Sequence, residues 1–171
     1  MNNEENINRA LNEATVIYGI QTAGYLYRGQ IINDTIYLER RIDEALTRHF
    51  CVDEEKKKEL FELIIASERM TFSNKIQVFE YLFRKHHKAF VEKYPLIFAD
   101  LKNINEERNI VAHYLLDTSK EGKEAFINNN KFGFVKFRNS TETIWREQKD
   151  YTKFHELQNK YILAMNEFLS T

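Results

Sequence analysis

The chain contains very few residues that interrupt regular secondary structure. Only one proline and five glycines occur among its 171 residues, against about 5% and 7% of residues in average proteins. Because proline and glycine end or weaken helices and strands, long uninterrupted elements are expected. Apolar residues recur mainly at spacings of three and four, which indicates helices. The sequence therefore predicts a mainly all-α helical bundle, forming one domain over residues 1–171.

Local signals predict where the helices of the first half begin and end. A first helix is expected over roughly residues 5–28, and Gly29 weakens it. Asn33 and Asp34 are candidate caps of a second helix, which would end near Phe50. Asp53 is expected to cap a third helix, whose inward-facing residues would be Leu60, Phe61, Ile64 and Ile65. A fourth helix, capped by Thr71 or Ser73, would carry a core stripe of Ile76, Phe79, Leu82 and Phe83.

The second half is predicted to be less regular. Pro95 suits the first turn of a fifth helix, which would run to about Leu116. The polar stretch 118–130 is expected to be a loop with a short helix near residues 124–127. Aromatic and β-branched residues in 131–147 predict a β-hairpin around Arg138-Asn139-Ser140. Asp150 would cap a last helix, with an apolar side made of Phe154, Tyr161, Ile162, Met165, Phe168 and Leu169.

Composition narrows the classes of function and location. The formal net charge of −1 argues against a protein that coats nucleic acid by bulk charge, although a local basic patch remains open. The single Cys51 cannot form an internal disulfide, which fits a reducing compartment. The acidic N-terminus lacks a signal-peptide core, and no apolar run is long enough to span a bilayer. We therefore expect a cytoplasmic protein with no membrane partner.

Two weaker candidates for a nucleic-acid surface involve basic residues. His86 and His87 lie among Arg84, Lys85 and Lys88, although the end of a solvated helix is the default interpretation. The predicted hairpin carries Lys131, Lys136, Arg138, Arg146 and Lys149, interleaved with Phe132, Phe134, Phe137 and Trp145. This mixture suits single-stranded nucleic acid, but the rings serve a protein core equally well. His49 and Cys51 have no further ligands at suitable spacing, so no metal or cofactor is expected.

The segment from Glu106 to His113 comes closest to specifying a chemistry. It places Arg108, Asn109 and His113 within about a turn and a half of the predicted fifth helix. Arg108 falls in the apolar register of that helix, where a charge is costly unless it is paired or reaches water. That register consists of Leu101, Ile104, Val111 and Leu115. A separate polar stripe contains Lys102, Glu106, Asn109, His113 and Asp117.

Each residue of the motif also has an ordinary structural explanation. Arg108 could pair with a carboxylate of another helix, His113 could be a surface histidine, and Asn109 a solvated amide. Their combination matters more than any one of them, because an arginine, an amide and a histidine can together grip a phosphate and move a proton.

Arg-Asn-x-x-Ala-His near the end of a helix resembles the motif of the HEPN superfamily, whose mark is an arginine and a histidine four to six residues apart. Two upstream segments agree: the stretch from Tyr37 to Leu46 and the stretch from Met70 to Ile76. The resemblance covers roughly residues 30–117. The pattern of this stretch is also similar to that of mannitol-operon-repressor-like proteins. It leaves the hairpin and last helix, in residues 118–171, unexplained.

The resemblance implies a dimer in which two motifs meet and cleave RNA without a metal. His113 would be the proton-transfer group, Arg108 would clamp the scissile phosphate, and Asn109 would orient either of them. Glu106 and Asp117 could bias the tautomer of His113, although no family rule supports that role. The expected product is a 2′,3′-cyclic phosphate.

Three hypotheses follow for the function. The first is a HEPN endoribonuclease of a toxin–antitoxin or phage-defence system, silenced by an antitoxin partner. The second is a non-catalytic HEPN-like regulatory module, dimeric and able to bind a nucleotide. The third is a helical scaffold without a site. The intact motif favours the first hypothesis, whereas the near-neutral net charge favours the second.

Overall fold

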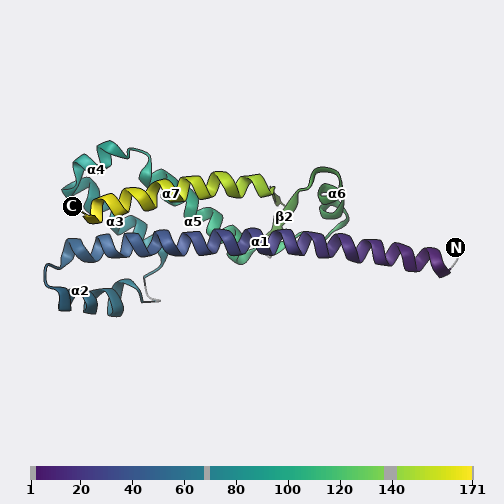
Figure 1. Ribbon diagram of the computed structural model, residues 1–171, viewed down its shortest axis with the longest axis horizontal. Helices are drawn as coiled ribbons and strands as arrows, with labels where there is room; N and C mark the ends of the chain where they lie inside the picture. Colours follow the sequence, from purple (N-terminus) through teal and green to yellow (C-terminus); the bar gives the residue numbers. More distant parts are fainter. Residues whose placement is uncertain (1–2, 68–69, 137–141, 171) are drawn as a thin grey trace. The chain divides into compact units, whose positions relative to one another are not determined.

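The structure is a computed structural model that describes residues 3–67, 70–136 and 142–170. The chain is mainly helical with a small antiparallel sheet, which confirms the predicted fold class. Figure 1 shows the elements, which are α1 (Asn3–Phe50), α2 (Glu54–Leu60), the π-helix η1 (Phe61–Ile65), α3 (Phe72–His86), α4 (Lys88–Lys93), α5 (Ile97–His113), β1 (Leu115–Leu116), α6 (Lys120–Asn129), β2 (Phe132–Val135), β3 (Thr143–Arg146) and α7 (Gln148–Ser170).

The first helix is longer than its local signals suggested. α1 continues without a break through Gly29, Asn33 and Asp34, so the predicted division into two helices is wrong (Figure 1). Its buried positions keep the spacing of three and four throughout: Ile20, Gly24, Tyr27, Ile31, Thr35, Leu38, Ile42 and Leu46. Burial of this face outweighs the helix penalty of Gly29, which is about 1 kcal/mol. Asp34 accepts a hydrogen bond from His155 Nδ1 at 2.6 Å instead of capping a helix.

The described chain divides into two compact units. The first combines residues 1–32 with 109–153, and the second combines 33–108 with 154–171. Each unit therefore joins two stretches that are far apart in the sequence. The single domain over 1–171, with a core in 30–117, stays a prediction.

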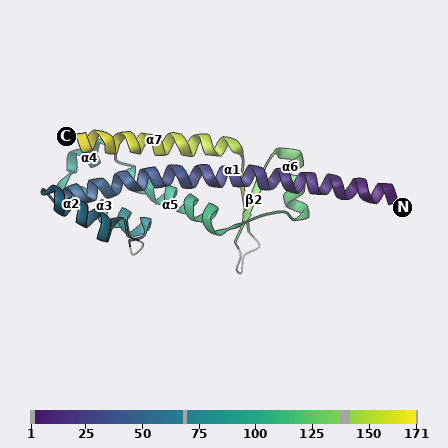
Figure 2. The same cartoon turned by 60° about the horizontal axis from the view of Figure 1, so that its bottom comes forward.

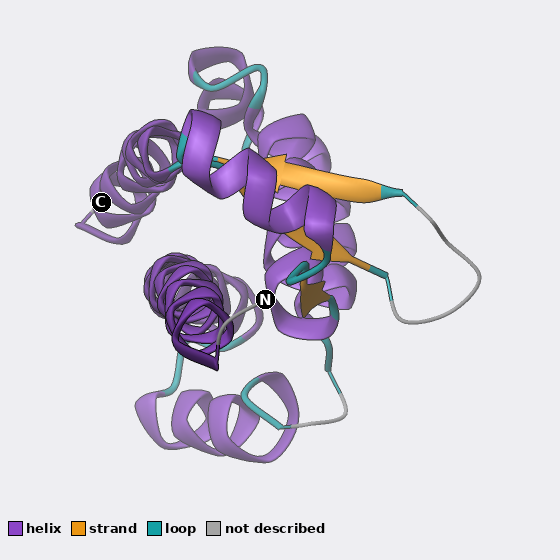
Figure 3. Ribbon diagram, turned by 90° about the vertical axis from the view of Figure 1, so that its right-hand side faces the viewer, coloured by secondary structure: helices purple, strands orange, loops and turns teal. Residues whose placement is uncertain are grey.

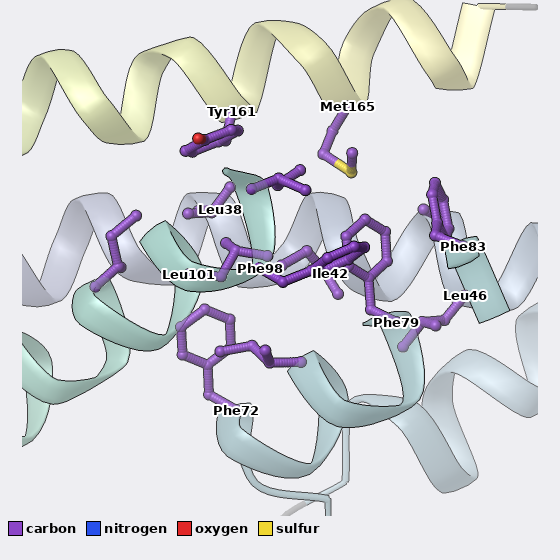
Figure 4. Packing of buried hydrophobic residues seen from close by; sticks show 14 of the residues in the cluster. Leu38, Ile42, Leu46, Phe72, Phe79, Phe83, Phe98, Leu101, Tyr161 and Met165 are labelled. Atoms are coloured by element: carbon purple, nitrogen blue, oxygen red, sulfur yellow. The ribbon is translucent and has the colours of Figure 1, made fainter. Parts of the chain in front are cut away.

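The second unit has an aromatic and aliphatic core. Figure 4 shows residues of the C-terminal part of α1, of α3, of α5 and of α7 converging on it. The fully buried members include Leu38, Ile42, Leu46, Phe79, Phe83, Leu101, Ile104, Tyr161 and Met165. The predicted stripe of α3 is buried as expected, and the Thr71 hydroxyl caps that helix by accepting from Asn74 N at 3.3 Å.

Helix α7 lies beside the C-terminal part of α1 within this unit (Figure 2). Gln158 Nε2 on α7 donates to Thr35 Oγ1 at 2.8 Å, and both side chains are buried. α7 begins at Gln148, two residues before the cap expected at Asp150. The Asp150 carboxylate still serves the first turn, because it accepts from the backbone N–H of Glu147 at 2.8 Å.

The third predicted helix starts as expected, but its expected inward face is only partly buried. Asp53 caps α2 by accepting from Lys56 N at 3.0 Å. From Phe61 onward the chain forms the π-helix η1, whose wider turn changes the face that each residue occupies. Ile65 is buried as expected, but the Ile64 side chain is 55% exposed.

The first unit contains a three-stranded antiparallel sheet in the order β1-β2-β3 (Figure 3). β2 and β3 form the predicted hairpin, and its expected turn, Arg138-Asn139-Ser140, lies outside the described residues. β1 was not predicted: Leu115 and Leu116 pair with Val135 and Phe134 instead of extending the fifth helix. Helix α6 is also longer than expected, because the Ser119 hydroxyl caps it and accepts from Gly122 N.

None of the helices in the described ranges combines the length and the apolar character that crossing a bilayer requires.

Candidate active site

Helix α5 carries all three residues of the Arg-Asn-x-x-Ala-His motif. Leu101, Ile104 and Val111 are completely buried, so the apolar register anchors this helix as expected. Leu115 does not belong to that register, because it lies beyond the helix in β1 and its side chain is 56% exposed. The motif therefore occupies the last turns of α5, immediately before the chain enters the sheet.

His113 is the final residue of α5 and is exposed. Asn109 lies four residues earlier, so helix geometry stacks the two residues on one face, about 6 Å apart along the axis. Asn109 is half-buried and makes interactions within the protein. An imidazole in this position is accessible to a macromolecular substrate, and a neighbouring amide is within one turn.

Arg108 precedes Asn109 on the same helix and is about 100° around its axis. It is half-buried and, like Asn109, interacts with other groups of the protein. A half-buried guanidinium is consistent both with a structural anchor and with an arginine whose head reaches a bound phosphate. The structure thus keeps Arg108, Asn109 and His113 on one continuous helix, as the sequence predicted.

The other polar residues of the predicted stripe have different roles. Lys102 Nζ pairs with Glu80 at 2.7 Å on the surface. Asp117 lies beyond β1, and its side chain is buried and accepts from the backbone N–H of Ser119 at 2.9 Å. Because Asp117 orders the turn before α6, the structure gives no support to a role in orienting His113. Glu106 is exposed on α5.

An arginine that sequence reasoning missed holds the chain at the end of α5. Arg28 on α1 donates from Nη2 to the carbonyl oxygen of Tyr114 at 2.8 Å, and the N–H of Tyr114 donates to Ile110 O at 3.0 Å. The residue after His113 is therefore fixed from two sides. Arg28 lies in the middle of a helix and 86 positions before Tyr114. No local pattern could have indicated this contact.

Arg28 also lines a cavity of about 250 Å³ in the first unit. The lining consists of Gln21, Tyr25, Arg28, Leu115, Leu116 and Thr118. Gly24 allows Leu116 to approach α1, because a Cβ atom at that glycine would lie 2.3 Å from Leu116 Cδ2. The cavity borders Leu115 and Leu116, which follow His113 by two and three residues.

The second unit contains a cluster of three histidines that are distant in sequence. His49 Nδ1 lies 3.2 Å from His87 Nε2, and the ring centroid of His86 is 5.1 Å from that of His49. Burial and the neighbouring imidazoles lower the pKa of both His49 and His87. The lowered pKa values disfavour the charged form of both rings, which weakens the idea that His87 belongs to a basic RNA-facing patch.

The basic hairpin and the side chains that could ligate a metal are the remaining features that could form a site. In the part of the chain that the structure describes, no three His, Cys, Asp or Glu side chains are arranged to hold a metal ion. Of the aromatic residues expected on the hairpin, Phe132 and Phe134 are buried against Tyr27, with ring centroids at 5.4 and 6.2 Å. Phe137 and Arg138 lie outside the described residues. The described rings of β2 are therefore core residues.

No protein-family model matches the chain, and neither a curated protein nor a solved structure matches it.

Proposed function

We propose that this protein is a metal-independent endoribonuclease of the HEPN type that acts as a homodimer through Arg108, Asn109 and His113. The observation that carries the proposal is the exposed His113 at the end of α5, one helical turn from Asn109 and five residues from Arg108. A mainly helical fold and a motif that ends its helix are both compatible with the resemblance in the sequence.

In the proposed reaction, neutral His113 accepts the proton of a ribose 2′-OH. An imidazole is suited to this step because it can both accept and release a proton under physiological conditions. The 2′-oxygen then attacks the adjacent phosphorus, the bond to the 5′-oxygen breaks, and a 2′,3′-cyclic phosphate remains. Arg108 stabilises the charge that develops on the phosphoryl oxygens. Asn109 orients the imidazole or the phosphate by a hydrogen bond.

A homodimer belongs to this proposal because one motif supplies only half of the proton transfers. The departing 5′-oxygen needs a proton, and a second copy of the motif would supply it. Such an activity suits a cytoplasmic toxin–antitoxin or phage-defence system, in which an antitoxin protein silences the nuclease.

The proposal is tested by incubating the purified protein with a mixed RNA pool in EDTA and mapping the cut ends. We expect cleavage that leaves cyclic-phosphate ends. His113→Ala should reduce the rate about 100- to 10,000-fold, the range typical of general acid–base groups. Arg108→Ala should reduce it about 100- to 1,000-fold, as for loss of one group that stabilises developing charge. Neither change should alter the circular dichroism spectrum or the oligomeric state.

A matched control is His86→Ala, because His86 is also an exposed histidine at the last position of a helix. This variant should cleave at the wild-type rate. If the wild-type dimer leaves every RNA intact, or if His113→Ala cleaves as fast as wild type, the nuclease proposal is wrong.

The second candidate is a non-catalytic, dimeric regulatory module that binds a nucleotide. The net charge of −1 favours it, because proteins that bind long RNA tightly usually carry more positive charge. A folded dimer that binds nucleotides but never cleaves RNA would support this candidate.

A further inference from the structure

The cavity beside the end of α5 contains a positive charge that the protein does not neutralise. Arg28 is half-buried, and within the described ranges no carboxylate forms an ion pair with it. Its one hydrogen bond to protein in those ranges goes to the uncharged carbonyl of Tyr114, and its buried Nε has no partner there. Partial burial of an unpaired charge is costly. Such an arrangement favours an anionic ligand.

The residues around Arg28 add the features of a nucleotide site. The guanidinium carbon lies 6.0 Å from the ring centroid of Tyr25 and 5.7 Å from that of Phe134. Phe134 is fully buried, whereas the Tyr25 side chain is 57% exposed and lines the cavity. An exposed aromatic ring next to an arginine is a common platform for an unpaired base and its phosphate.

The size and polar lining of the cavity suit one nucleotide. Its volume of about 250 Å³ is too small for a duplex but admits a base or a ribose phosphate. Gln21 and Thr118 contribute an amide and a hydroxyl to the lining, and both groups can donate and accept hydrogen bonds. Among the described residues that line it, none is an aspartate or glutamate that would repel a phosphate.

We propose that this cavity is a subsite for one nucleotide of single-stranded RNA, in which Arg28 contacts a phosphate and Tyr25 stacks on the base. The inference deepens the proposed function and rests on it for the identity of the ligand. The subsite would hold the RNA next to the end of α5, because Arg28 also fixes Tyr114, the residue that follows His113. Arg28 and Tyr25 are binding residues in this proposal, and the proton transfer remains with His113.

The test separates binding from cleavage. A fluorescent 2′-O-methyl RNA oligonucleotide of mixed sequence serves as the probe, because it lacks the 2′-OH that the proposed reaction requires. Its affinity is measured by anisotropy in EDTA at several salt concentrations, and cleavage of ordinary RNA is measured on the same proteins. Thermal melting reports whether each variant is folded.

We expect Arg28→Met to weaken binding at least tenfold and to lower the salt slope by about one. Tyr25→Ala should weaken binding about 5- to 150-fold, as expected from loss of one stacked base, whereas Tyr25→Phe should bind like wild type. Arg40→Met is the matched control, because Arg40 is an exposed arginine of the same helix that pairs with Glu44. His113→Ala should bind normally and fail to cleave.

The outcomes of the two assays distinguish the subsite from the nuclease. If wild type cleaves while Arg28→Met and Tyr25→Ala bind as tightly as wild type, the subsite is wrong and the nuclease remains. If binding depends on Arg28 and Tyr25 but no variant and no wild-type sample cleaves, the nuclease is wrong and the subsite remains. Absence of binding to wild type overturns the subsite. If Arg28→Met is unfolded, the affinities of the Tyr25 variants decide between the outcomes, because the exposed ring of Tyr25 contributes little to the fold.

Discussion

Replacing Lys75 with methionine would remove the positive charge from a buried ionic cluster in the second unit. Lys75 on α3 is 3% exposed, and its Nζ contacts Glu39 Oε1 at 2.6 Å and Asp43 Oδ2 at 2.8 Å on α1. Asp43 is also buried, and its Oδ1 has no hydrogen-bond partner among the described groups. Methionine fills a similar volume but leaves the carboxylate of Asp43 without an ammonium partner.

The size of the loss in unfolding free energy depends on how the protonation of Asp43 changes when Lys75 is replaced. Burial raises the pKa of Asp43 to about 6, although the hydrogen bond and charge of Lys75 oppose that shift. Without Lys75 the remaining influences, burial and the neighbouring Glu39 and Glu44, all raise the pKa further. Breaking a buried pair by removing one partner typically costs about 3–5 kcal/mol. We expect a loss in this range at pH 8.

The loss should depend on pH with a definite sign. Below pH 6 Asp43 is protonated in folded wild type and in the folded variant. The ionic part of the difference in unfolding free energy between the two proteins therefore disappears. Above pH 6 Asp43 ionises in the folded wild type but stays protonated in the folded variant. In the unfolded chains the carboxyl is ionised at these pH values. The difference in unfolding free energy should therefore grow by about 1.4 kcal/mol per pH unit above pH 6.

The assay is urea unfolding of wild type and Lys75→Met at several pH values between 5 and 8. Lys102→Met is the matched control, because Lys102 belongs to an ion pair with Glu80 in which the lysine side chain is 58% exposed. We expect the control to lose less than about 1 kcal/mol. The double change Lys75→Met with Asp43→Leu should recover most of the loss. A difference between wild type and Lys75→Met that is the same at pH 5 and pH 8 would refute this reasoning.

Two further predictions concern α1 and the histidine cluster. Gly29→Ala should raise the unfolding free energy by about 1 kcal/mol, because the added Cβ meets no atom within 4 Å. Gly24→Ala should lower the unfolding free energy and weaken oligonucleotide binding, because the added Cβ would displace Leu116 from the cavity wall. Equal melting temperatures for the two variants would contradict this. The lowered pKa values of His49 and His87 mean that the unfolded chain binds protons more readily, so this pair makes the protein less stable as the pH falls below 6.5. Changing both to glutamine should remove this loss, so that the unfolding free energy falls less, or rises more, from pH 7 to pH 5 in the variant than in wild type; an equal change in the two proteins would disprove it.

Helix starts were the part of the fold that local sequence could predict. The caps at Asp53 and Thr71 depend on a side chain and a backbone N–H three residues later, so the local sequence contains the whole interaction. The hairpin was predictable for a similar reason, because its two strands are close in sequence. The continuity of α1 was not predictable, since Asn33 and Asp34 look like caps until α7 and its His155 are present.

Elements that depend on distant partners were missed. β1 has only two residues and is a strand because Leu115 and Leu116 pair with β2. The residues of the candidate site fall into the same two classes, those that a local pattern identifies and those that only the folded chain brings together. Arg108, Asn109 and His113 lie in one short motif and could be identified from it, whereas Arg28 is brought to Tyr114 only by the folded chain.

The core of the second unit has a consequence for synthesis on the ribosome. It needs Leu38 near the beginning of the chain and Tyr161 and Met165 much later in it. At about 5–20 residues per second, the early helices wait several seconds for these last two side chains. During that interval the apolar faces of α1 and α3 are open to other partners. A chaperone that covers these faces would meet the protein before its core closes.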